Sequence, residues 1–394
     1  MEKITLKNGL KIYLKKTNST TVTIQANIKI GSANENSKEK GYSHFVEHML
    51  FEGTKKRNNF QIANEIEKVG GELNGATSSN RTIFYIKVPK KYSQKALDIL
   101  SDILLNASFE KKMFNKEKKV ILSEIDLYYD DPKLHQWTLF ENNLFNSNLK
   151  NSTLGTKYSI KNCKRENLIE YYKKHYLSEN IFFTIAGNYS KFNFKQLEKI
   201  TKGKTSIKLV EKPLLKNKKI IEKRKISQSY IIVGYKTIEK NNDDSIILDV
   251  IHSILGRGVS GKLFDEIRNK RGLGYSVYNY SENGKSSGLF AIAVSTKKEN
   301  LNKVENIIKT LIKNLKNINK NELNEAKEYI LGKHQMEIED TRYVADELSE
   351  WIHYSNLNKM KQYFKKIKNI TKKDILNVVN KYLKKNLTII ISQK

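Results

Sequence analysis

Alternation of apolar and polar residues predicts strands near the start of the chain. Residues 3–16 and 21–31 alternate with a period of two, and Asn8-Gly9 favours a tight turn inside the first stretch. Residues 71–79 and 81–89 alternate in the same way across a short turn. The pattern therefore predicts an opening hairpin and a second hairpin further along the chain.

Helical periodicity marks the segments between and after these strands. Apolar residues recur at three- and four-residue intervals, the spacing of a helix with one buried face. In the last of these helices we expect Val120, Ile121 and Leu127 to form an apolar stripe. The predicted helices cover residues 43–53, 60–69, 93–106 and 114–129.

The second half of the chain repeats the first. Residues 174–187, KHYLSENIFFTIAG, resemble residues 380–392, NKYLKKNLTIIIS, at a separation of roughly two hundred residues. We expect an α+β protein with two copies of one fold. The predicted domains are 1–201 and 226–394, joined by a Lys-rich linker at 202–225.

Residues 43–53 carry the strongest chemical signal. His44 and His48 are four apart, so on a helix both imidazoles point to the same side and can bind one tetrahedral metal ion. Glu47 stands between them and is better placed to act on a water molecule than to complete the ligand set. The order H-x-x-E-H occurs among zinc peptidases. The alternative interpretation is two helix histidines that are four apart by chance.

A carboxylate helix follows downstream. Glu117 and Glu124 are seven apart, which is two helical turns, and therefore share one face of the helix predicted at 114–129. Two histidines leave a zinc ion short of one protein ligand, and Glu124 is the candidate for it, with Glu117 supporting the ligands from behind. The alternative is that both glutamates are ordinary solvated residues. In the repeated half, His44 aligns with His252 but His48 aligns with Gly256, so we expect that half to lack a metal.

Composition indicates the compartment of the protein and the kinds of partner that it binds. The chain has 394 residues, no twenty-residue apolar run and no apolar leader at Met1, and its single cysteine, Cys163, allows no internal disulfide. We therefore expect a soluble, cytoplasmic protein that does not bind a membrane. The net charge of +30 comes almost entirely from evenly spread lysine, without an arginine cluster or a nucleic-acid-binding motif, so we expect no specific nucleic-acid partner.

Several motifs together resemble one family. GYSHFVEHMLFEGT, GGELNGATSSNRTIFYIKV, EKKVILSEI and GRGVSGKLFDEIRNKRGLGYSV are similar to segments of the pitrilysin and insulinase-like zinc peptidases. Within that family the chain resembles the group of about 400 residues that includes the mitochondrial processing peptidase subunits. The resemblance covers the whole chain and implies two α/β-roll domains, each an antiparallel sheet backed by helices. Together they would form half of a clamshell.

The resemblance also implies roles for individual residues. The family's zinc ligands fall on His44, His48 and Glu124, its general base on Glu47 and its supporting glutamate on Glu117. Its arginine and tyrosine that reach the reacting peptide from a later domain match Arg268 and Tyr275. Its substrate-binding edge strand matches Leu73, Asn74, Gly75, Ala76 and Thr77.

Two positions depart from the family pattern. The interval from His48 to Glu124 is about one residue shorter than usual, and Gly75 replaces the family's alanine. Neither change removes a reacting group.

The expected function is zinc-dependent endopeptidase activity, with one Zn²⁺ per chain. Unfolded peptides would be hydrolysed inside a closed cavity formed by a homodimer. The first alternative is the catalytic subunit of a heterodimeric processing peptidase, which needs a distinct partner. The second alternative is a catalytically silent structural subunit.

Overall fold

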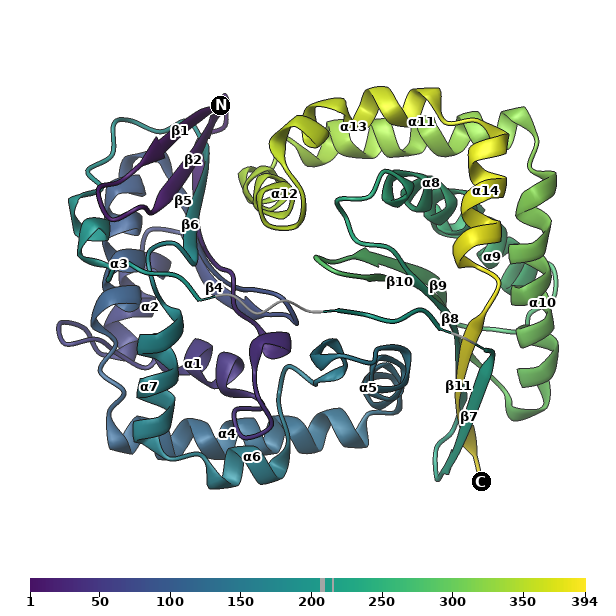
Figure 1. Cartoon of the computed structure of the whole chain (residues 1–394), viewed down its shortest axis with the longest axis horizontal. Coiled ribbons are helices and arrows are strands. Elements are labelled where there is room, and N and C mark those ends of the chain that lie inside the picture. The colour runs from purple at the N-terminus through teal and green to yellow at the C-terminus, as the bar shows by residue number, and fades with distance from the viewer. Residues whose placement is uncertain (206–209, 215) are drawn as a thin grey trace. The chain divides into compact units, whose positions relative to one another are not determined.

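The computed structural model describes residues 1–205, 210–214 and 216–394 (Figure 1). The chain forms two compact units, each with its own sheet and apolar core. The first unit comprises Met1–Leu127, Asn151–Leu209 and Glu337–His353. The second comprises Tyr128–Lys150, Val210–Met336 and Tyr354–Lys394.

The sheet of the first unit has six strands in the order β1-β2-β6-β3-β5-β4. Neighbouring strands are antiparallel except β2 and β6, which are parallel. β4 is an edge strand. The strands are β1 (Glu2–Thr5), β2 (Lys11–Lys16), β3 (Thr21–Ile28), β4 (Glu72–Thr77), β5 (Thr82–Pro89) and β6 (Ile181–Gly187).

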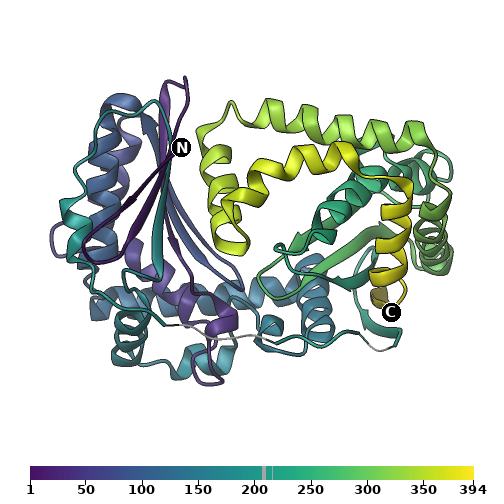
Figure 2. The same cartoon turned by 45° about the horizontal axis from the view of Figure 1, so that its top comes forward.

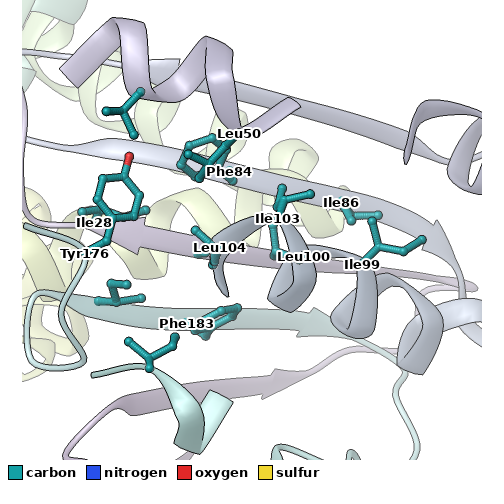
Figure 3. Close-up of a cluster of buried hydrophobic side chains, with 14 of the residues drawn as sticks. Ile28, Leu50, Phe84, Ile86, Ile99, Leu100, Ile103, Leu104, Tyr176 and Phe183 are labelled. Carbon is teal, nitrogen blue, oxygen red and sulfur yellow. The ribbon is translucent and has the colours of Figure 1, made fainter. Parts of the chain in front are cut away.

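One face of this sheet packs against helices and forms the core of the unit. Figure 3 shows part of this core, where Ile28, Phe84 and Phe183 of the sheet meet Leu50 of α1 and Leu100 of α3. The period-two pattern of β3 sends every second side chain into this core. The helices of the unit are α1 (Tyr42–Phe51), α2 (Asn59–Glu67), α3 (Ser93–Asn106), α4 (Lys111–Asp130), α6 (Lys157–Asn162), α7 (Arg165–His175) and α12 (Thr341–Tyr354).

The opposite face of the sheet is polar and carries α12. Figures 1 and 2 show α3 on one side of the sheet and α12 on the other. The hydroxyls of Thr23 and Thr341 lie 2.9 Å apart, and Arg81 Nη1 donates to Ser349 Oγ at 2.7 Å. Hydrogen bonds therefore attach a helix from the second half of the sequence to the first unit.

The sheet of the second unit has five strands in the order β7-β11-β8-β10-β9. Its order and directions match β2-β6-β3-β5-β4 of the first unit, including one parallel pair, β7 with β11. The duplication predicted from the sequence is therefore confirmed. The strands are β7 (Lys218–Arg224), β8 (Ser229–Thr237), β9 (Val277–Asn283), β10 (Gly288–Thr296) and β11 (Asn386–Gln393).

α5 (Pro132–Leu144) belongs to the second unit, although it follows α4 directly in sequence. Phe140 of α5 is fully buried and lies over Gly234 of β8, where a Cβ would stand only 2.1 Å from the phenylalanine ring. This glycine is what allows the helix to approach the sheet so closely. The other helical segments are α8 (Asp244–Gly256), α9 (Lys262–Phe264), a π-helical turn (Asp265–Asn269), α10 (Leu301–Asn314), α11 (Lys320–Glu337), α13 (Leu357–Asn369) and α14 (Lys372–Tyr382).

The predicted α+β class with two repeated sheets backed by helices is confirmed, and each sheet has one parallel pairing in addition to the expected antiparallel ones. The predicted division into 1–201 and 226–394 differs from the compact units, because α5 and α12 each pack with the other half. The predicted linker, 202–225, contains β7 and also residues 206–209 and 215, which lie outside the described residues.

The apolar stripe predicted for α4 is wrong at two of its three positions. Ile121 is fully buried, but the side chains of Val120 and Leu127 are 43% and 58% exposed. The buried face of α4 instead runs through Phe114, Glu117 and Ile121. Because Glu117 is polar, the buried face of α4 does not appear as an apolar repeat in the sequence.

Among the described residues, no helix combines the length and the apolar character needed to cross a bilayer.

Candidate metal centre

α1 is held by apolar packing on one side and by a buried carboxylate at its start. Phe45, Val46 and Leu50 are fully buried in the core of the first unit. Glu35, which is only 1% exposed, accepts hydrogen bonds from the backbone N–H groups of Gly41 and Ser43 at 2.7 and 2.8 Å. These are donors that the first turn of a helix leaves without a partner. Burial raises the pKa of Glu35 to about 8, although both backbone hydrogen bonds act to lower it.

Glu35 is not among the site residues predicted from the sequence. In the sequence it is one of two acidic residues in the polar loop before the helix, six residues ahead of Gly41. Such a residue is ordinarily solvated, and only the folded loop turns it inward.

His44, His48 and Glu124 bring three potential ligand atoms within 4.8 Å of one another. The two Nε2 atoms of the histidines are 3.3 Å apart, and Glu124 Oε2 lies 3.7 Å from His44 Nε2 and 3.9 Å from His48 Nε2. Ligands at ~2.0–2.1 Å from a tetrahedral zinc ion are themselves separated by ~3.4 Å. The donor set and its spacing therefore fit zinc, and the shortened interval between His48 and Glu124 has not moved the carboxylate out of reach.

The protonation states of the two histidines also suit a metal. Burial and the neighbouring His48 lower the pKa of His44 to about 3, so its imidazole is neutral at physiological pH. Burial acts to lower the pKa of His48 too, but the hydrogen bond with Glu117 and the charges of Glu47 and Glu124 raise it overall. A metal ion held by His48 Nε2 would require that nitrogen to be unprotonated, because only a neutral imidazole nitrogen is a ligand.

Glu117 lies behind His48 and does not belong to the three-atom cluster. Its Oε2 is 2.9 Å from His48 Nδ1, and its Oε1 is 3.2 Å from Lys116 Nζ. The hydrogen bond with His48, together with Lys116, lowers the pKa of Glu117 despite its burial. A carboxylate that accepts a hydrogen bond from Nδ1 leaves Nε2 free to bind a metal and fixes the ring orientation. Glu117 thus contacts the back of the His48 ring, and its supporting role stays a prediction.

Glu47 lies between the cluster and the edge strand β4. It is 9% exposed, and its Oε2 accepts a hydrogen bond from Thr77 Oγ1 at 2.5 Å. Burial raises the pKa of Glu47, an effect partly offset by this hydrogen bond and by the charge of His48. A Cβ added to Gly75 would lie 3.1 Å from Glu47 Oε1, so the backbone of β4 runs directly beside the carboxylate. Gly75 and Thr77 of the segment Leu73–Thr77 thus lie next to Glu47, and the substrate-binding role of the segment stays a prediction.

Arg268 and Tyr275 lie together in the second unit. Arg268 Nη1 donates to the Tyr275 carbonyl at 2.7 Å, and its guanidinium lies 4.9 Å from the centre of the tyrosine ring. The side chain of Tyr275 is 73% exposed. A partly buried arginine and an exposed tyrosine therefore form one pair in the second unit, whereas the histidine and glutamate cluster belongs to the first unit.

The second unit fills the position where the first unit holds its cluster. Gly256 is the counterpart of His48, and a Cβ there would lie 1.8 Å from Asn279 Oδ1. Asn279 Nδ2 donates to the His252 carbonyl at 2.8 Å. An asparagine thus occupies the space of the missing histidine, which explains why one copy of the repeat alone carries the cluster among the described residues.

A duplicated α/β fold with a two-histidine, one-carboxylate cluster in one copy defines a class of metallopeptidases. Two family models match in succession: Insulinase (Peptidase family M16) over residues 11–157 and Peptidase M16 inactive domain over residues 162–330. A zinc protease of uncharacterized function from Rickettsia bellii is 31% identical over 97% of this chain and 95% of its own. Another, YmxG from Bacillus subtilis, is 30% identical over 86% of this chain and 85% of its own.

Solved structures share the fold. A protease from Helicobacter pylori matches with a TM-score of 0.92 at 20% identity over 99% of both chains. A Pseudomonas fluorescens structure described as a peptidase M16 inactive domain matches with a TM-score of 0.89 at 17% identity, over 100% of this chain and 98% of its own. The chain belongs to the M16 peptidase family, and zinc is the cofactor that the family and the cluster define.

Proposed function

We propose that this protein is a zinc-dependent endopeptidase that cleaves unfolded peptides. The observation that carries the proposal is the convergence of His44, His48 and Glu124 within 4.8 Å, with the buried carboxylate of Glu47 beside them and next to an open strand edge. Ligands, base and peptide-binding backbone are the three components that hydrolysis of an amide requires.

In this proposal each residue has one task. His44, His48 and Glu124 hold the zinc ion, and Glu117 keeps the ring of His48 in the orientation that presents Nε2. When bound, zinc supplies Lewis-acid polarisation of the peptide carbonyl and lowers the pKa of water. Glu47 accepts a proton from the attacking water and returns it to the leaving amine.

The substrate binds as an additional strand along β4. An edge strand presents backbone N–H and C=O groups that pair with any extended peptide, so recognition depends little on sequence. Folded proteins cannot offer such a free strand, which restricts cleavage to unfolded chains. Arg268 and Tyr275 contribute donors for the carbonyl oxygen as negative charge develops on it.

A mixed peptide library tests this function. Purified protein should cleave many library members at internal bonds. A chelator should stop cleavage, because His44, His48 and Glu124 contribute to the reaction only by holding the zinc ion. Mass spectrometry of the products measures both effects. Cleavage that is unaffected by chelation contradicts a zinc mechanism. An inactive but zinc-loaded chain points to the need for a distinct partner subunit.

We further propose that the active form is a homodimer in which Arg268 and Tyr275 act on the partner's site. Both sets of residues occur on this one chain, so two identical copies can supply each other. Mixing equal amounts of a His48→Ala chain and a Tyr275→Phe chain should restore up to about a quarter of the wild-type activity. About half of the dimers are then mixed, and one of the two sites in each mixed dimer is intact. Turnover of the mixture is measured against each variant alone. Failure to recover, with mixed dimers present, favours a site completed within one chain.

A further inference from the structure

The edge strand β4 presents an alternating set of backbone groups to the outside. Ser78 N–H donates to the Arg81 carbonyl at 2.8 Å, which fixes this pair as hydrogen-bonded, and the next pair in the register is Thr77 with Thr82. Hydrogen-bonded and non-hydrogen-bonded pairs alternate along an antiparallel ladder. The backbone N–H and C=O groups of Thr77 and Gly75 therefore point away from β5, towards the open edge. In agreement, Gly75 N–H donates at 2.8 Å to the side chain of Asn74.

The side chain of Thr77 points towards α1 instead. Its Oγ1 lies 2.5 Å from Glu47 Oε2 and 3.5 Å from Thr82 Oγ1. The hydroxyl of Thr82 already donates its proton to the Ile30 carbonyl, at 2.9 Å. A hydroxyl has one proton to donate, and the carboxylate of Glu47 is much the stronger and nearer acceptor.

One oxygen of Glu47 is held by β4. Oε2 accepts the hydrogen bond of the Thr77 hydroxyl, and Oε1 lies near Gly75, where an added Cβ would come within 3.1 Å of it. Turning the carboxylate away from β4 would break a charge-assisted hydrogen bond.

We propose that Thr77 is a positioning residue for Glu47, and that it ties the orientation of the base to the strand on which the peptide binds. This inference rests on the proposed peptidase function. A peptide that pairs with the backbone of Thr77 immobilises the same residue whose hydroxyl orients the carboxylate, so substrate binding and alignment of the base become one event. Preorganisation of this kind acts on the reaction step more than on affinity.

Three substitutions distinguish a positioning role of the Thr77 hydroxyl from a packing role of the Thr77 side chain. Thr77→Val keeps the shape and removes the hydroxyl, and Thr77→Ser keeps the hydroxyl and removes the methyl group. Thr82→Val is the matched control, because it makes the same exchange at the cross-strand position without touching Glu47. Steady-state kcat and KM on a cleaved library peptide, and zinc content after dialysis, are measured for each.

We expect Thr77→Val to lower kcat about 10- to 100-fold, the effect of losing one hydrogen bond to a charged group, with KM changed less than about threefold and zinc retained. Thr77→Ser should restore kcat to within a few-fold of wild type, and Thr82→Val should leave it nearly unchanged. A Val variant with wild-type kcat, an equal loss in the Ser variant, or a loss confined to KM or to zinc content overturns the proposal.

A second measurement does not depend on turnover. Crystal structures of the wild-type protein and of Thr77→Val show directly where the carboxylate of Glu47 points. We expect it to turn from β4 or to become disordered in the variant. An unchanged, ordered carboxylate overturns the role of Thr77 even if the wild-type protein proves inactive on peptides, whereas inactivity alone counts against the proposed function.

Discussion

Replacing Glu47 by glutamine is expected to lower kcat by about 10²–10⁴-fold while leaving zinc bound, because general acid and base catalysis contributes about that much to a reaction. Glutamine fills the same volume beside β4 and its carbonyl can still accept the hydrogen bond of Thr77. It cannot accept a proton from water at neutral pH. None of the three atoms of the metal cluster belongs to Glu47, so the ligand set stays intact.

Turnover and bound zinc are measured together on the same Glu47→Gln preparation. Glu67→Gln is the control for the chemical exchange, since Glu67 is exposed at the end of α2. Retention of more than about a tenth of the wild-type kcat would show that another group acts as the base, given the size of the effect expected for a true one.

The second large effect is the loss of zinc from Glu124→Gln. An amide oxygen is a weak neutral donor in place of an anionic one, and Glu124 Oε2 lies within 4 Å of both histidine nitrogens. The variant should lose its metal on dialysis and its activity with it. Metal analysis after dialysis at fixed pH measures this directly.

Glu117→Gln is the matched comparison, because it makes the same exchange two turns earlier on the same helix. Glu117 contacts His48 Nδ1 and no atom of the cluster, so its loss should weaken zinc binding or activity about 10- to 100-fold without emptying the site. The α-carbons of Glu117 and Glu124 are ~10 Å apart along the helix axis at 1.5 Å per residue, so neither side chain can take the other's place without a large slide of α4. Zinc lost from Glu117→Gln but kept by Glu124→Gln would reverse the assignment.

The metal cluster was predictable because each of its features is local. Two histidines four apart on an apolar helix, and two glutamates seven apart on another, follow from the helical repeat alone. That the two helices meet at Glu124 did not follow from spacing, and the resemblance to a family supplied it. The strands of the first sheet were equally clear where alternation was strong, as in β3 and β5.

The features that sequence did not reveal depend on distant partners. α12 packs on a mostly polar sheet face, where Thr341 and Ser349 form hydrogen bonds beside an apolar contact of Val344 and Ala345 with Ala186. β7 is an edge strand of mostly charged residues and resembles a linker until β11 pairs with it. Glu35 is an ordinary loop residue in sequence, and only the turn before α1 buries it.

A zinc titration of the metal-stripped protein tests the central claim most directly. The stripped chain should be inactive on a library peptide, and activity should rise in proportion to added zinc until it reaches a plateau at one zinc per chain, the capacity of the single three-atom cluster in the described residues. The His48→Ala chain should stay inactive throughout the same titration. Activity that survives stripping, or that zinc fails to restore to a correctly folded chain, would contradict the account.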